Sequence, residues 1–176
     1  MTCACADDEH RGLVAFRGRP MTLLGEIRRI GMAAPDFSVV DAELRQLRLS
    51  DFRGEKVLVN SFPSLDLPAA GSRLGALSNA AGRYGGIRML AVSMDLPFAF
   101  RRLARTVMTG VTPLSDYPAA EFGTGYGLLM RECRLLARAV LAIDEGGRLR
   151  HQEIAAEATE DVDMDAALRS IVGFGG

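Results

Sequence analysis

The chain has 176 residues, of which 48% are hydrophobic and 24% charged, and its formal net charge is −1. A chain of this size buries roughly 70% of its unfolded surface as one domain, which excludes a disordered chain and a disulfide-dependent miniprotein. Its 21 basic residues nearly balance 22 acidic residues, so the composition predicts no nucleic-acid partner.

The N-terminal residues are polar. Residues 1–19 carry acids and arginines in place of the apolar stretch of a signal peptide, and no run of ~18 apolar residues occurs elsewhere. We therefore predict a cytoplasmic protein without a membrane span. Residues 1–12 are predicted to be a flexible tail, and residues 13–176 a single domain.

Two strand-like runs open the domain. Leu13–Phe16 and Met21–Leu24 flank a Gly-Arg-Pro turn, a pattern typical of a β-hairpin. The apolar run Val57–Phe62 predicts a central strand that is buried on both faces.

Helix and strand patterns then alternate. A stripe of apolar residues at helical spacing, Leu74 to Tyr84, predicts a helix that ends near Gly85. Ile87–Ser93 is predicted to be the next strand, and Pro97–Met108 the next helix.

The last third of the chain predicts a hairpin followed by a helix. Residues 137–144 and 148–154 flank a Glu-Gly-Gly turn, and Met164, Leu168 and Ile171 share one helix face. The glycine-rich segments 123–125 and 173–176 are predicted to be a turn and a tail, because neither has the strand-then-helix context of a phosphate-binding loop. The order of elements predicts an α/β domain with a mixed central sheet, flanking helices and an N-terminal β-hairpin.

Three segments resemble the bacterial thiol peroxidases, which are atypical two-cysteine peroxiredoxins. They are Phe62–Asp66, Ser93–Ala99 and Leu135–Val140, followed by Ile143 and Asp144. The resemblance extends from about Leu13 to Leu168. It implies a thioredoxin-like fold, a homodimer and a thioredoxin-type reductant.

The family's chemistry uses a peroxidatic cysteine in the first turn of a helix. The resemblance implies that the helix N-terminus and an arginine lower the pKa of this thiol, that a threonine orients the peroxide, and that a resolving cysteine lies on the following helix. This chain keeps the family's proline as Pro63 and its arginine as Arg138. Leu67 stands at the threonine position, Ala70 at the peroxidatic position and Ala104 at the resolving position.

An alanine methyl cannot attack a peroxide, so we interpret the chain as a thiol-peroxidase homologue without cysteine-based peroxide reduction. Engineered replacement of two cysteines would leave neighbouring positions unchanged, but Pro68 and Gly71 also depart from the family pattern. The substitutions are therefore interpreted as a natural loss. The predicted role is a binding or regulatory module, with a small molecule or an active peroxiredoxin as partner.

The alternative is a peroxidase or redox sensor with a relocated thiol. Cys133 precedes Arg138 by five residues, and Arg131 or Arg134 would lower the pKa of its thiol. The competing interpretation is a thiol that only packs beneath a loop.

A further thiol pair lies in the predicted tail. Cys3 and Cys5 with His10 are candidates for a soft-metal site or an easily reduced disulfide, although a fourth ligand and a fixed backbone are missing. A mobile tail is the simpler interpretation, and no cofactor is predicted. His151 lies in a predicted strand without a Ser-His-Asp arrangement.

Arg138 has lost its family partner. If its guanidinium points towards Ala70, a buried cation requires an anion, either Asp66, Asp95 or a small bound anion, or ordered water. The alternative is that carboxylates or carbonyl groups hold Arg138 as part of the strand scaffold.

Overall fold

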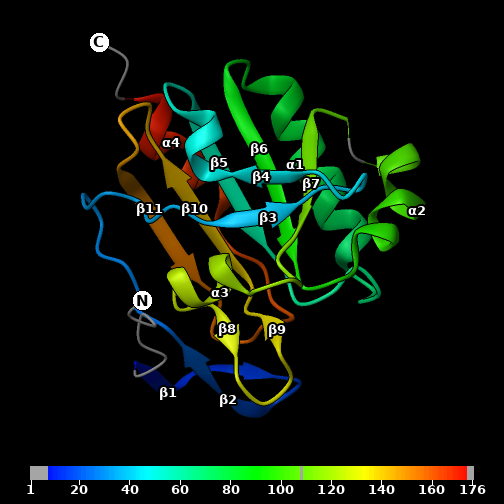
Figure 1. Ribbon diagram of the computed structural model, residues 1–176, viewed down its shortest axis with the longest axis vertical. Helices are drawn as coiled ribbons and strands as arrows, with labels where there is room; N and C mark the ends of the chain where they lie inside the picture. Colours follow the sequence, from blue (N-terminus) through cyan, green and yellow to red (C-terminus); the bar gives the residue numbers. More distant parts are fainter. Residues whose placement is uncertain (1–7, 108, 174–176) are drawn as a thin grey trace.

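The computed structural model describes residues 8–107 and 109–173, with the side chains of 103–107 left out. A seven-stranded mixed sheet forms the body of the molecule, and a four-stranded antiparallel sheet lies at one end (Figure 1). The predicted α/β domain with a mixed central sheet and an N-terminal hairpin is confirmed. None of the helices in the described part of the chain is long and apolar enough to cross a membrane.

In chain order the elements are β1 (Glu9–Phe16), β2 (Arg19–Leu24), β3 (Ser38–Val40), β4 (Gln46–Arg48), η1 (Leu49–Phe52), β5 (Lys56–Ser61), α1 (Ala70–Arg83), β6 (Ile87–Ser93), α2 (Pro97–Val107), β7 (Val111–Ser115), α3 (Glu121–Gly125), β8 (Leu129–Met130), β9 (Leu135–Leu136), β10 (Ala139–Ile143), β11 (Leu149–Ile154) and α4 (Met164–Val172).

The large sheet has the strand order β11-β10-β5-β6-β7-β3-β4. Strands β5, β6 and β7 are parallel, because α1 and α2 cross over between them, and the remaining pairs of this sheet are antiparallel. The predicted strands, the two long helices and the C-terminal hairpin are therefore confirmed within one or two residues at most ends.

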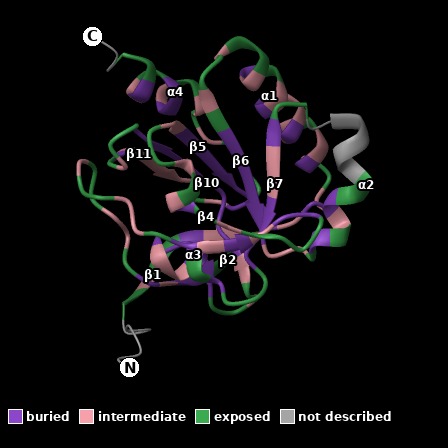
Figure 2. Ribbon diagram, turned by 45° about the horizontal axis from the view of Figure 1, so that its top comes forward, coloured by how far each residue is buried: buried purple, intermediate pink, exposed green. Residues whose placement is uncertain are grey.

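Each face of the large sheet buries its own core. Leu58 packs beneath α1, α2 and α4, whereas its neighbours Val57 and Val59 point to the opposite face. This alternation follows from the two-residue period of a strand, and it explains why the central strands read as continuous apolar runs. In Figure 2 these strands are buried along most of their length.

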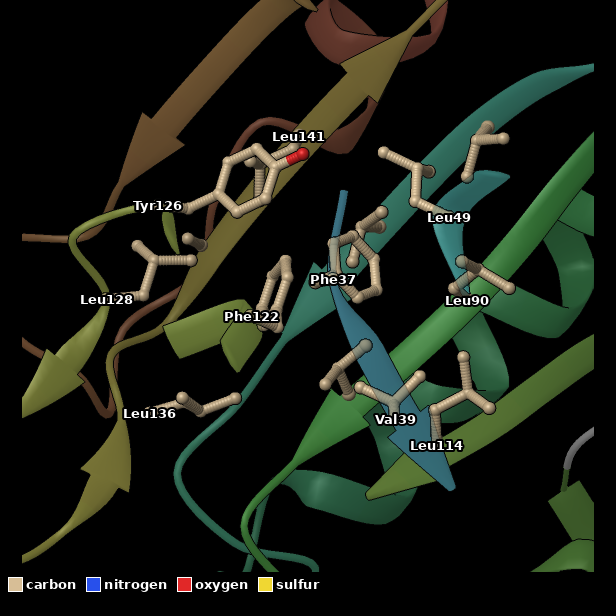
Figure 3. Packing of buried hydrophobic residues seen from close by; sticks show 14 of the residues in the cluster. Phe37, Val39, Leu49, Leu90, Leu114, Phe122, Tyr126, Leu128, Leu136 and Leu141 are labelled. Atoms are coloured by element: carbon tan, nitrogen blue, oxygen red, sulfur yellow. The ribbon is translucent and has the colours of Figure 1, made fainter. Parts of the chain in front are cut away.

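Three aromatic rings fill the core on the face away from α1. Phe37 and Phe122 meet edge to face with their ring centroids 5.0 Å apart, and Tyr126 lies 5.9 Å from Phe37 (Figure 3). The Tyr126 hydroxyl donates to the Pro35 carbonyl at 2.7 Å. Residues 123–125 were predicted to form a turn, but they complete α3, because Phe122 anchors this short helix in the core.

The small sheet contains the predicted N-terminal hairpin, but its first strand starts earlier than expected. β1 begins at Glu9, and His10 pairs with Leu23 of β2. Residues 9–12 thus belong to a strand and not to the predicted tail, since backbone pairing with β2 needs no apolar side chains. Asp8, directly before the strand, accepts a hydrogen bond from the Gly25 N–H at 2.9 Å through its carbonyl. Residues 1–7, with Cys3 and Cys5, are outside the described residues.

A buried carboxylate holds the start of α3. Asp116 accepts hydrogen bonds from the backbone N–H groups of Phe122 at 3.1 Å and Gly123 at 2.8 Å. Its side chain is inaccessible to solvent, and this burial raises the pKa of Asp116 to about 7.

Asp116 should make the stability of the protein depend on pH. Because its pKa is raised in the folded state, its contribution is fully present below about pH 4 and is lost as the pH rises through about 7, with a slope of at most ~1.4 kcal/mol per pH unit. Asp116→Asn should flatten this part of the profile in urea unfolding at pH 5 and pH 7. Asp66→Asn, at an exposed carboxylate, should leave the slope unchanged. Equal slopes for wild type and Asp116→Asn would contradict the assignment.

Candidate functional site

The loop from β5 to α1 is fixed by a carboxylate at the end of β6. Asp95 accepts hydrogen bonds from the Ser64 hydroxyl at 2.9 Å, the Leu65 N–H at 2.8 Å and the Ser93 hydroxyl at 2.8 Å. These bonds set the path of the chain into α1 and consume the acceptor capacity of Asp95.

Ala70 is the first residue of α1. Its side chain is buried, and its N–H donates to the Leu67 carbonyl at 2.9 Å. The preceding Ala69 supplies no side-chain cap, and the first turn holds no acidic residue. The partial positive charge of the helix N-terminus is therefore not balanced by any side chain of that turn.

A cavity of about 10 Å³ lies beside Ala70, with room for about one water molecule. The residues around it include Asn60, Pro63, Ser64, Leu67, Ala70 and Arg73. The structure thus brings Pro63, Leu67 and Ala70 together, as expected. Ala104 lies in α2, but its side chain is outside the described residues.

Arg138 lies directly before β10 and is 4% exposed. Its Nη1 donates hydrogen bonds to the Asn60 side-chain oxygen and, at 2.9 Å, to the Ser61 carbonyl, while its buried Nε has no partner. Burial, with a smaller effect of the nearby Arg73 charge, lowers the pKa of Arg138 to about 10. The guanidinium still carries a charge at neutral pH.

The prediction that Asp66 or Asp95 pairs with Arg138 is wrong. Asp66 forms an exposed ion pair with Arg102 at 3.3 Å, and Asp95 is held within the loop before α1. Among the described residues, no carboxylate forms an ion pair with Arg138. The alternative interpretation was that carboxylates or carbonyl groups hold Arg138 as part of the strand scaffold. Oxygens of β5, from the Asn60 amide and the Ser61 carbonyl, do hold this side chain.

Arg73 places a second cation near Arg138. It lies three residues after Ala70 on α1, its Nε donates to Asp161 at 2.6 Å, and its Nη2 donates to the Thr159 carbonyl. The sequence analysis missed Arg73, although the spacing of three residues places it on the same helix face as Ala70. Asn60 was not predicted either, although it is a polar residue within the apolar run of β5.

A larger cavity of about 420 Å³ lies between α1 and the start of α4. The residues around it include Asn60, Arg73, Arg138, Asp161, Asp163 and Asp165. Asn60 and Arg73 also contact the small cavity, so the two spaces are neighbours. The candidate site is therefore this pair of cavities at the N-terminal half of α1.

Cys133 lies elsewhere, in the turn between β8 and β9. It is half-buried, carries no disulfide and packs against the cluster under the small sheet, which includes Val14 and Leu23. Cys133 is not among the residues around either cavity. Arg131, one of the arginines expected to act on this thiol, pairs with Glu9 at 2.7 Å.

The other candidate residues are also dispersed. His10 Nε2 lies 3.1 Å from the Gly25 carbonyl, and His151 Nε2 lies 3.7 Å from a Glu153 oxygen. Within the described part of the chain, no group of three His, Cys, Asp or Glu side chains is arranged to hold a metal. Cys3 and Cys5 are outside that part.

Comparison with known proteins points to one family. Residues 30–152 match the model of the AhpC/TSA family. A thiol peroxidase of Staphylococcus aureus strain MRSA252 is 39% identical over 156 residues, covering 88% of this chain and 94% of that protein. A thiol peroxidase of Oceanobacillus iheyensis is 35% identical over 156 residues, covering 88% of this chain and 95% of that protein.

Solved structures agree in fold. A peroxiredoxin-like protein from Aquifex aeolicus superimposes with a TM-score of 0.83 at 29% identity, over 92% of this chain and 97% of that chain. A thiol peroxidase from Chromobacterium violaceum has a TM-score of 0.79 at 20% identity, over 89% of this chain and 93% of that chain. The expected thioredoxin-like peroxiredoxin fold is confirmed.

A thiol introduced at position 70 tests whether the surroundings of Ala70 still stabilise an anion. In a chain whose three native cysteines are replaced by serine, Ala70→Cys should give a thiol with a pKa below the ~8.5 of free cysteine, because the α1 N-terminus and Arg73, which lines the same small cavity, favour the thiolate. The pH dependence of alkylation by iodoacetamide measures this pKa. Asn79→Cys, at an exposed position of the same helix that lines neither cavity, is the control. Equal pKa values at the two positions would contradict the prediction.

Proposed function

Since the chain belongs to the thiol peroxidase branch of the AhpC/TSA family, we propose that it is a member without cysteine-based peroxide reduction, acting as a binding or regulatory module. The observation that carries this proposal is the buried alanine at the first residue of α1. The proposed binding site is the pair of cavities beside Ala70 and Arg138.

The proposal rests on the chemistry of peroxide reduction. A thiolate sulfur must attack one peroxide oxygen and break the O–O bond, which leaves a sulfenic acid on the protein and releases water or an alcohol. Among the residues around the small cavity the one hydroxyl group is that of Ser64, which donates a hydrogen bond to Asp95 and has no sulfur to oxidise. The residues present beside Ala70 cannot perform this step.

Binding is supported by what the chain retains. Arg138 is a buried cation that forms no ion pair with the described residues, although the charges of Asp161 and Glu153 raise its pKa, and it lines a cavity of about 420 Å³. A small anion that reaches this guanidinium would supply the missing negative charge. The cavity volume is within the roughly 300–1,000 Å³ of small-molecule sites.

Peroxide consumption by the purified protein tests the proposal. With hydrogen peroxide, an organic hydroperoxide and a thioredoxin-type reductant, we expect no turnover above the rate of buffer, and the same for Cys133→Ser. The Ala70→Cys variant serves as the comparison, since it restores sulfur at the family's reacting position.

The alternative function is a peroxidase or redox sensor that uses Cys133. Its support is a half-buried thiol that carries no disulfide. Turnover by the wild type that disappears in Cys133→Ser would establish this alternative. Turnover that survives Cys133→Ser and deletion of residues 1–12 would show that another group reacts, and would also overturn the main proposal.

An apolar surface near α2 supports a dimer as the proposed assembly. Leu96, Phe98 and Tyr117 are 55%, 54% and 42% exposed. The segments that carry them are joined where the Ser115 hydroxyl donates to the Asp95 carbonyl, directly before Leu96 and two residues before Tyr117. Such a patch is typical of an interface, here with a second copy or with an active peroxiredoxin. The cytoplasmic location stays a prediction.

Phe98→Glu should convert the dimer to a monomer, because burying an unpaired carboxylate in an apolar interface is unfavourable. Sedimentation velocity measures the change in mass. Leu13→Glu, on the exposed side of β1, should leave the assembly unchanged. If wild type sediments as a monomer, or if Phe98→Glu remains a dimer, this surface is not the interface.

A further inference from the structure

The cavity between α1 and α4 carries uncommitted charges of both signs. We propose that it binds a small zwitterion, whose carboxylate lies on Arg138 and whose ammonium group lies on Asp165. This inference rests on the proposed function, because it names the class of ligand for the same site.

Arg138 supplies the anion-binding end. Both of its hydrogen bonds are made by Nη1, to Asn60 and to the Ser61 carbonyl, and its Nε is buried without a partner. The edge formed by Nε and Nη2 presents two parallel N–H groups, which is the edge that binds a carboxylate in bidentate fashion. Within the described part of the chain, no protein carboxylate occupies that edge.

The neighbouring charges are already engaged in the protein. Arg73 donates to Asp161 and to the Thr159 carbonyl. Asp163 caps α4, since its side chain accepts from the Ala166 N–H at 2.8 Å, and its other oxygen lies 3.9 Å from Arg169. These groups shape the cavity but do not require a ligand.

Asp165 is different. It is exposed, lines the same cavity, and forms no ion pair or side-chain hydrogen bond with the described residues. Its position in the first turn of α4 stabilises the helix dipole without consuming its oxygens as acceptors.

The charges around the cavity disfavour a simple anion. Two arginines face three carboxylates, namely Asp161, Asp163 and Asp165, so a ligand with negative charge alone is attracted at Arg138 and repelled at the rim. A ligand with an acidic group at one end and an amino group at the other interacts favourably with both. The cavity of about 420 Å³ accommodates a molecule of amino-acid size.

Isothermal titration calorimetry with matched probes tests the inference. The zwitterions are glycine, 4-aminobutyrate and 6-aminohexanoate, which vary the separation of the charges, and the controls are butyrate and butylamine. We expect one zwitterion to bind at least tenfold more tightly than either control. Asp165→Asn should weaken the binding of that zwitterion at least fivefold without weakening butyrate. Glu160→Gln, an exposed acid that does not line the cavity, should change neither.

A second variant addresses the other end of the ligand. Arg138→Lys keeps the positive charge but loses the bidentate edge, and should weaken zwitterion binding at least tenfold, with far-ultraviolet circular dichroism confirming the fold. Equal affinities for butyrate and the best zwitterion, or no binding of any zwitterion at about 10 mM, would overturn the inference. Peroxide turnover is measured on the same preparations. Absence of both binding and turnover refutes this inference alone, whereas turnover refutes the proposed function.

Discussion

The contact between Arg138 and the end of β5 is the constraint on which the site depends. Through Nη1 this side chain ties the start of β10 to Asn60 and to the Ser61 carbonyl, directly before the loop that leads into α1. A buried cation costs several kcal/mol to desolvate. Within the described residues the hydrogen bonds of Arg138 go to neutral oxygens, and the carboxylates of Asp161 and Glu153 favour its charge without forming an ion pair with it. The fold therefore keeps the positive charge of Arg138 at the cavity beside the N-terminal half of α1.

The same arrangement explains how the proposed loss of the reaction leaves the scaffold of a peroxidase intact. Asp95 still fixes the entry into α1, Pro63 still lines the small cavity, and the helix N-terminus still faces it. Under the proposed function, Ala70 takes the place of the reacting thiol, so the sulfur atom is absent. Arg138 offers a positive charge and Asp165 a negative charge, so the site is suited to a ligand that carries both.

Much of the fold was predictable because its signals are local. The apolar run of β5 and the helical periodicity of α1 are sufficient to define both elements. The two-residue strands β8 and β9 carry too few residues for a pattern, and α3 forms around glycines because Phe122 is anchored in the core. The resemblance located Pro63, Leu67 and Ala70, but the partners of Arg138 depend on strand pairing between β5 and β10, which no spacing in the sequence reveals.

The most direct test of the central claim is a single-turnover measurement of oxidation at the protein's own thiols. The protein is mixed with one equivalent of hydrogen peroxide, quenched with an alkylating reagent at successive times, and weighed intact by mass spectrometry. The account predicts that all three thiols stay available for alkylation at every time point, because they oxidise no faster than free cysteine. A rapid gain of about 16 Da for a sulfenic acid, or a rapid loss of two alkylation sites to a disulfide, would contradict it.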